Sequence, residues 1–190
     1  MMETLDSAGV KALIGDTPIR QDVLEAALAR HEADRAAHAI GEAAAVGDLE
    51  ATMRWAKALE DFMNSGDGFV LHACFCRAVE LLRDVPEVVI GGLPEKPQPS
   101  LYREREEREL AMAAAVARHE AGTALREGNY PQAMRTLAVL RPFVQAFFAR
   151  IDFKDAEPAL RDNRLKLVRE LRDTLCLVGD LSKIEARTEV

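Results

Sequence analysis

Apolar positions recur along the chain at the spacing of amphipathic helices, and glycines and prolines mark where the predicted helices end. The first predicted helix covers about residues 20–46 and is rich in alanine. Gly47 and Asp48 indicate a stop followed by an N-cap, so a second helix is expected from there to about residue 63. After a turn over residues 64–68, helical spacing resumes and predicts a third helix over residues 69–83.

The second half of the chain starts with a connection rich in proline and glycine, over residues 84–100. Residues 88–90 within it could form a short strand, but no partner strand is apparent elsewhere. Helices are then predicted over about residues 104–126, 131–151 and 158–178. Gly128 suits the C-terminal end of the first of these, and Pro142 is expected to kink or split the second. The pattern therefore predicts an all-α fold, a helical bundle.

Composition agrees with this prediction and narrows the class of protein. Hydrophobic residues make up 48% of the 190 residues and charged residues 30%, which is typical of a soluble globular protein. No apolar run approaches the roughly 20 residues needed to span a bilayer, and the N-terminus does not resemble a signal peptide. Three cysteines do not suggest a disulfide framework. We therefore expect a cytoplasmic protein that does not bind a membrane.

Net charge argues against a protein that coats nucleic acid nonspecifically, because the whole chain carries −7. The distribution changes that view. Residues 141–172 hold eight Lys and Arg against five Asp and Glu, whereas residues 1–140 are strongly acidic. We therefore expect no DNA partner, and any contact with RNA should be local to residues 141–172.

Candidate metal ligands and catalytic motifs are weak in this sequence. Cys74 and Cys76 lie about 200° apart around a helix axis and cannot converge on one ion. His31, Asp34 and His38 share a helix face and could hold zinc, but a fourth ligand is missing and a solvated polar face is favoured. The phosphate-binding glycine loop and the G-x-S-x-G and H-E-x-x-H motifs are absent from the sequence. We therefore expect no catalytic residues and no metal ligands.

The last predicted helix carries several cations around an apolar arc. Arg164 falls in the middle of that arc, so it is expected to be a buried structural cation paired with Asp180 or with a carboxylate of residues 152–157. Arg161 and Arg172 lie on one flank with Arg169 beyond them. Asn163, Lys166 and Glu170 are expected to point outward. This flank is either a solvated edge of the helix or a ridge whose arginines bind phosphate groups.

Several short motifs occur in one order along the chain. In chain order they are Ile19-Arg20-Gln21-Asp22-Val23, Asp67-Gly68-x-x-Leu71-x-Ala73-x-x-Cys76-Arg77-Ala78, Glu127-Gly128-Asn129-Tyr130-Pro131-Gln132-Ala133, Leu140-Arg141, Val144-Gln145-Ala146-Phe147-Phe148, Ala159-Leu160-Arg161-Asp162-Asn163-Arg164-Leu165 and Val178-Gly179-Asp180-Leu181-Ser182. Together they resemble the C-terminal end of the β subunit of bacterial two-subunit glycyl-tRNA synthetases, over about residues 19–186.

This resemblance implies an anticodon-binding domain of the DALR type over residues 67–190, preceded by a helical segment over residues 1–66. The naming motif would be Pro158-Ala159-Leu160-Arg161. It implies support for glycine–tRNA ligation without a catalytic site. The partners would be the anticodon region of tRNA(Gly), the α subunit and the rest of the β subunit. No cofactor is expected here, since ATP and Mg²⁺ would belong to the separate catalytic subunit. The RNA-binding candidates are Arg141, Arg161, Asn163, Lys166, Arg169 and Arg172.

Some positions depart from the family pattern and keep an alternative open. Cys76 stands where a lysine is usual and Glu80 where an asparagine is usual, while Gln145 and Ala149 replace acidic residues. A cation and an amide have thus become a thiol and an anion, which weakens the case for RNA contact from that helix. The alternative is a helical protein–protein interaction module that docks onto other subunits, or a diverged stand-alone relative that does not bind RNA.

Overall fold

The fold is helical throughout the part of the chain that the computed structural model describes. The described residues are 19–38, 45–83, 96–153 and 157–185, without the side chains of residues 31–38 and 45–49. No strand occurs among them, which confirms the all-α prediction. The possible strand over residues 88–90 lies outside the described residues. In order, the longer helices are α2 (Gln21–His38), α3 (Ala45–Met63), α4 (Gly66–Arg83), α6 (Arg105–Arg126), α7 (Tyr130–Ala138), α8 (Arg141–Arg150) and α9 (Pro158–Leu175), joined by the 3₁₀ turns η2 (Pro99–Leu101), η3 (Cys176–Val178) and η4 (Leu181–Lys183).

The structure confirms one predicted helix boundary and contradicts another. Pro142 does split the predicted helix over residues 131–151, because α7 ends at Ala138 and α8 begins at Arg141. The prediction that Gly47 and Asp48 separate two helices is wrong, since both lie inside the first turn of α3. N–H groups in a first turn have no intrahelical partner, and an acidic residue there suits the helix dipole. A helix therefore tolerates this pair at its start.

Tight turns before α4 and before α7 depend on particular small and polar residues. A Cβ atom at Gly68 would lie 2.0 Å from the carbonyl oxygen of Phe62, so only glycine lets α4 begin this close to α3. The hydroxyl of Ser65 donates to that same carbonyl at 2.6 Å. Gly128 has a φ of 69° and turns the chain between α6 and α7. The side chain of Asn129 then caps α7 by accepting from the N–H of Gln132 at 3.3 Å.

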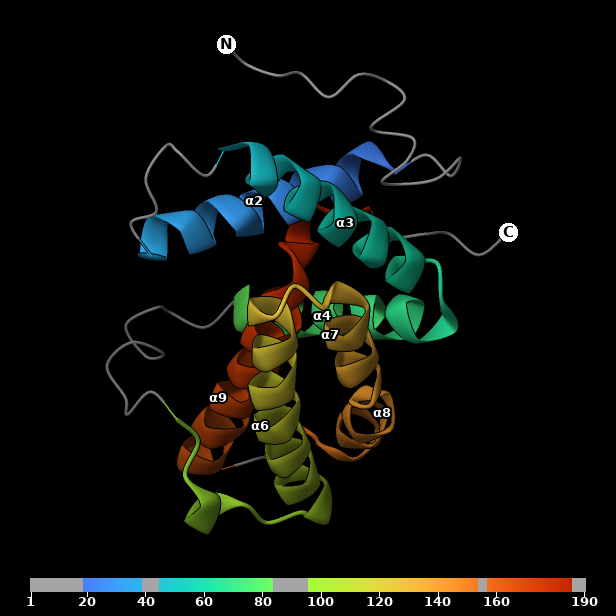
Figure 1. Cartoon of the computed structure of the whole chain (residues 1–190). Coiled ribbons are helices and arrows are strands. Elements are labelled where there is room, and N and C mark those ends of the chain that lie inside the picture. The colour runs from blue at the N-terminus through green and yellow to red at the C-terminus, as the bar shows by residue number, and fades with distance from the viewer. Residues whose placement is uncertain (1–18, 39–44, 84–95, 154–156, 186–190) are drawn as a thin grey trace.

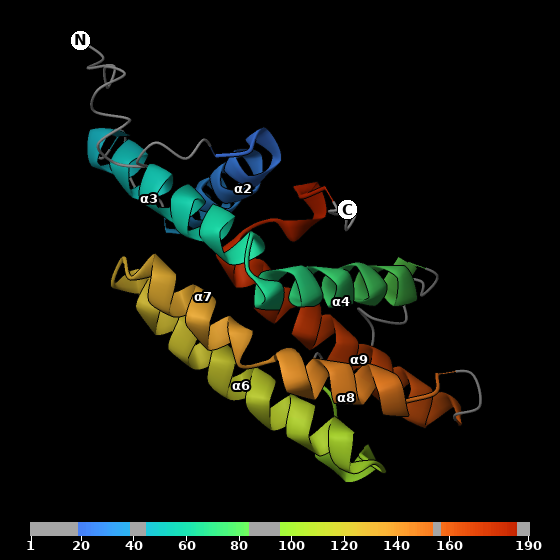
Figure 2. The same ribbon diagram turned by 90° about the vertical axis from the view of Figure 1, so that its right-hand side faces the viewer.

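The helices surround a single core that is lined mainly by leucine, alanine and phenylalanine side chains. Figure 2 shows α7 and α8 lying end to end along α6, while α9 packs against both α4 and α6. Helices α2 and α3 lie across one end of this group (Figure 1). The end of α9 therefore approaches α2 and α3, and its start lies at the far end near the start of α6.

Side chains and backbone groups join α2 and α3 to the C-terminal turns. The indole N–H of Trp55 donates to the carbonyl of Val178 at 2.7 Å, and its ring stacks on Tyr130 at 5.3 Å. The backbone N–H of Asp180 donates to the carbonyl of Ala26 at 3.1 Å. The core cluster thus contains residues on both sides of the boundary at 66/67. The predicted division into 1–66 and 67–190 stays a prediction.

Candidate nucleic-acid interface

Arg164 on α9 is buried and paired. Its side chain is 8% exposed, and its Nε donates to Oε1 of Glu107 at 2.9 Å. Its terminal nitrogen donates to the carbonyl of Asp152 at 2.7 Å. The buried carboxylate partner is therefore Glu107 of α6 and not Asp180, while Asp152 contributes its backbone carbonyl. Asp155, which falls in the predicted range 152–157, lies outside the described residues. The sequence pattern could not show this pairing, because it does not tell which face of α6 meets α9.

Glu107 is fully buried and serves two elements at once. Its second oxygen accepts from the backbone N–H groups of Arg103 and Glu104, each at 2.7 Å, which completes a capping box at the start of α6. One carboxylate therefore caps α6 and holds the guanidinium of Arg164. This arrangement fixes the register of α9 against α6 and so sets which α9 side chains reach the surface.

Two of the expected RNA-binding residues are buried instead. The prediction that Asn163 and Lys166 point outward is wrong, because they are 1% and 7% exposed. The Asn163 side chain accepts from the backbone N–H of Gln98 at 2.6 Å and donates to the carbonyl of Gln98 at 3.1 Å. The segment before η2 covers this part of α9. The prediction failed because it considered α9 alone, and a helix considered alone exposes that face to solvent.

The four remaining candidates do not form one site. Arg161 is exposed, whereas Arg169 and Arg172 are half-buried. Arg172 donates to the carboxylate of Asp173 from two of its nitrogens, at 2.9 and 2.6 Å. Arg141 begins α8 and donates to Asp67 at 2.8 Å, so two of the quoted motifs meet at the starts of α8 and α4.

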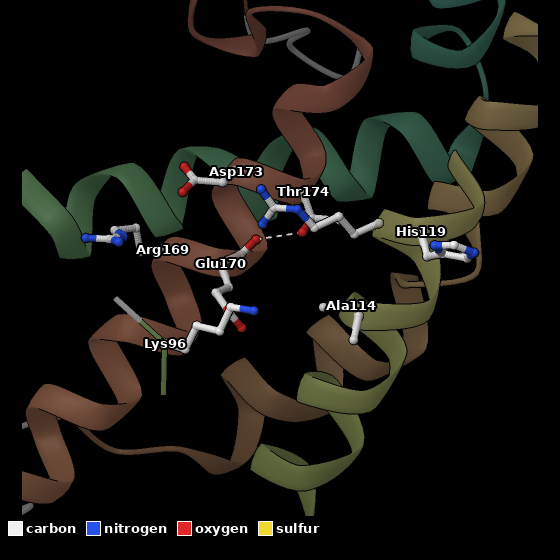
Figure 3. Close-up of a pocket in the computed structure, with 9 residues that line it drawn as sticks. Lys96, Ala114, His119, Arg169, Glu170, Asp173 and Thr174 are labelled. Carbon is white, nitrogen blue, oxygen red and sulfur yellow. Dashed lines mark hydrogen bonds between the residues drawn. The ribbon is translucent and has the colours of Figure 1, made fainter. Parts of the chain in front are cut away.

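A polar groove of about 580 Å³ lies between α6 and α9, and it contains Arg169. Arg118 of α6 lines one wall. Figure 3 shows His119 on the same helix and Lys96, which comes from the segment before η2. The groove thus collects cations from three separate parts of the chain. Its full lining is Lys96, Ala114, Ala115, Arg118, His119, Arg169, Glu170, Asp173 and Thr174.

Glu170 gives the groove a carboxylate among these cations. Burial raises the pKa of Glu170 above its ordinary value of 4.5, while the nearby charges of Arg118, Lys96 and Arg169 act in the opposite direction. Within the described chain, no ion pair closer than 4 Å is formed by this carboxylate. The hydroxyl of neighbouring Thr174 donates to the backbone carbonyl of Glu170 at 2.7 Å, as the dashed line in Figure 3 marks.

This combination of groups suits a single-stranded nucleic acid. Lysine and arginine side chains bind phosphate oxygens, and a carboxylate accepts hydrogen bonds from the amino groups of bases. Sequence reasoning missed Lys96, Arg118 and Glu170. Lys96 lies in the proline-rich connection, and no periodic signal places that connection beside α9. The pairing of α6 with α9 likewise depends on contacts far apart in the chain.

Two of the substituted family positions, Cys76 and Glu80, lie on α4 and do not line this groove. Cys76 and Glu80 are exposed, and the guanidinium of Arg77 lies over the ring of Phe148 at 4.7 Å from its centroid. Phe147 and Phe148 are both buried. They therefore serve the core and do not offer a stacking platform to a base.

The described residues hold no metal-binding cluster and no membrane-spanning helix. Within them, no group of three His, Cys, Asp or Glu side chains could hold a metal ion. The side chains of His31, Asp34 and His38 lie outside the described part. Among the described helices, none has the length and apolar character required to cross a bilayer.

The all-helical fold is that of a known class of anticodon-binding domain. Residues 71–189 match the family model described as the DALR anticodon binding domain, and the chain belongs to that family. It is also similar to the glycine–tRNA ligase beta subunit of Ruegeria sp. (strain TM1040), with 33% identity over 93% of this chain and 24% of that relative. The same protein of Phenylobacterium zucineum is 34% identical over 82% of this chain and 22% of its own length. The chain therefore spans about a quarter of the length of these relatives.

Proposed function

We propose that this chain is the tRNA-binding part of a glycine–tRNA ligase beta subunit and that it contacts the anticodon region. The observation that carries this proposal is the groove between α6 and α9, which brings Lys96, Arg118 and Arg169 to one surface of an anticodon-binding fold. Its role would be to add affinity and identity readout to glycine–tRNA ligation. Catalysis, with its ATP and Mg²⁺, would belong to a separate subunit.

The cations and the carboxylate of the groove would contact different parts of the RNA. Lys96, Arg118 and Arg169 would neutralise phosphates of an unpaired loop. Glu170 would accept a hydrogen bond from the edge of a base that the loop turns outward, since unstacked bases expose their edges to proteins. Arg161 is exposed near the start of α9, and it would contact the RNA backbone next to this loop. The partners of the complete protein would be tRNA(Gly), the α subunit and the rest of the β subunit.

Titration of the chain with a tRNA(Gly) transcript tests this proposal. Arg118→Ala and Arg169→Ala should each weaken binding, because each removes one phosphate contact from the groove. Arg54→Ala is the matched control, since Arg54 is an exposed cation on α3 that pairs with Glu50. It removes the same charge at a distance from the groove. Equal losses in all three variants would mean that net charge alone governs binding, and the groove would then have no special role.

A second titration separates the anticodon from the rest of the tRNA. A transcript with the anticodon bases replaced should bind less tightly than the original, while a transcript altered only in the acceptor stem should bind equally well. If both altered transcripts bind as tightly as the original, the chain binds RNA in general, and the proposal of anticodon readout is overturned.

A further inference from the structure

A second groove lies on another side of α6, and its lining is apolar. It measures about 350 Å³ and lies between α6 and the α7–α8 pair. Four large hydrophobic side chains are exposed in the described residues, and three of them gather here: Met112 at 72%, Val139 at 62% and Val116 at 56%. The fourth, Leu28, is on α2. A concentration of this kind indicates a surface that binds another apolar surface.

This apolar groove is separate from the polar groove between α6 and α9, which is proposed to bind RNA. Residues of an α-helix turn by about 100° each, so Met112 and Val116 face away from Ala114 and Arg118 of the polar groove. Ala113 and Ala117 also line the apolar groove, and such small side chains let another element approach closely. Phe143 of α8 completes the opposite wall.

Charge and backbone chemistry restrict what can occupy this groove. Its only charged lining residues are Glu109 and Glu120, one towards each end, which are about 16 Å apart along α6. Glu109 pairs with exposed Arg105 at 2.6 Å, and an exposed pair of this kind is weak enough for a partner's cation to share the carboxylate. Both walls are helices whose backbone groups are already bonded, and the described residues contain no strand edge that an extended peptide could extend. A helix brings its own backbone hydrogen bonds and needs only an apolar stripe.

We propose that the groove between α6 and the α7–α8 pair binds an amphipathic helix of a partner protein, with lysine or arginine residues flanking its apolar stripe. The stripe would cover Met112, Val116 and Val139, and the basic flanks would lie near Glu109 and Glu120. A second copy of this chain fits less well. In a two-fold contact the same patch faces itself, and its glutamates would then meet glutamates.

A labelled helical peptide tests the proposal by fluorescence anisotropy. The probe carries leucines at three positions spaced by four and three residues, with lysines before and after them, and a matched probe carries glutamates in place of the lysines. The lysine probe should bind at least about tenfold more tightly than the glutamate probe. Val116→Gln should weaken its binding by about tenfold, because a buried valine contact is lost. Glutamine is a good helix former, so α6 should persist.

Leu28→Gln is the control variant, since it removes an exposed apolar side chain outside the groove and should leave binding unchanged. Binding of tRNA should be the same for Val116→Gln as for the unaltered chain, which separates this proposal from the RNA-binding one. Equal affinity for the two probes, or an unchanged affinity in Val116→Gln, would overturn the proposal. So would sedimentation showing a dimer of this chain that Val116→Gln abolishes, because the occupant would then be a second copy.

Discussion

Arg164 is the residue whose removal should harm the fold most directly. Its guanidinium is buried against Glu107, so Arg164→Ala would leave a buried carboxylate without its cation. Breaking one partner of a buried ion pair costs about 3 kcal/mol or more. We expect chemical denaturation to show a loss of that size in the free energy of unfolding. Arg161→Ala, three residues earlier on an exposed position, should change stability little.

The double variant Arg164→Met with Glu107→Leu separates the ion pair from the cap. Replacing both charges with apolar side chains should recover part of the lost stability. The double variant should remain about 1 kcal/mol less stable than the unaltered chain, because Glu107 also accepts from two backbone N–H groups at the start of α6. An Arg164→Ala protein with unchanged stability would refute the structural role of this pair.

His72 of α4 should make stability depend on pH. Burial lowers the pKa of His72 below its ordinary value of 6.5, and its Nε2 lies 3.3 Å from the carbonyl oxygen of Leu181. The unfolded chain therefore takes up a proton at a higher pH than the folded chain. The contribution of neutral His72 is fully present above about pH 6.5 and is lost as the pH falls from there towards its lowered folded pKa.

Urea denaturation between pH 7.5 and 5.5 measures this effect. His72→Gln should flatten the decline in stability over that range, because the group that takes up the proton is gone. His119→Gln should retain the decline, since His119 is exposed on α6. Identical pH profiles for the unaltered chain and His72→Gln would contradict the assignment.

At the scale of elements, one amide side chain joins the segment before η2 to α9. Asn163 accepts from and donates to the backbone of Gln98, and Lys96 of the polar groove lies two residues earlier. Asn163→Ala should cost about 1–3 kcal/mol, since buried backbone groups lose their partner. It should also weaken tRNA binding modestly, because Lys96 is no longer held beside Arg169.

Neighbouring Asp162→Ala provides the comparison, as Asp162 lies half-buried on α9 outside the groove lining. We expect a change within about 0.5 kcal/mol and no loss of tRNA affinity. If Asn163→Ala lowered stability but left tRNA affinity intact, Lys96 would have no part in binding.

The sequence predicted the elements well because each is encoded locally. Gly128 marks the end of α6, and Pro142 separates α7 from α8. The spacing of leucines predicted α9, and all of these signals act within a few residues. Arg164 on the apolar arc was identifiable by the same periodicity. Its partner Glu107 was not, since the two residues are 57 positions apart. The candidate groove depends on the same long-range packing, so Lys96, Arg118 and Glu170 escaped detection and Asn163 was misplaced.

At the scale of the whole molecule, the two grooves use different sides of α6. The polar groove faces α9 and the apolar groove faces α7 and α8. One helix could therefore contact RNA and a partner protein at the same time without competition between them. A chain of net charge −7 also repels nucleic acid in general, so any RNA contact must come from the few cations gathered locally.

The salt dependence of tRNA binding tests this picture of few, local contacts. Each phosphate neutralised on a single strand contributes about −0.7 to the slope of log affinity against log salt. Lys96, Arg118 and Arg169 line the groove, so two to four contacts and a slope of about −1.4 to −2.8 are expected. Arg118→Ala should make the slope shallower by about 0.7, whereas Arg54→Ala should leave it unchanged. Titrations at four salt concentrations measure both quantities. A slope of about −5 would require roughly seven phosphate contacts, more than this groove can supply, and would show that the tRNA spreads over other surfaces of the chain.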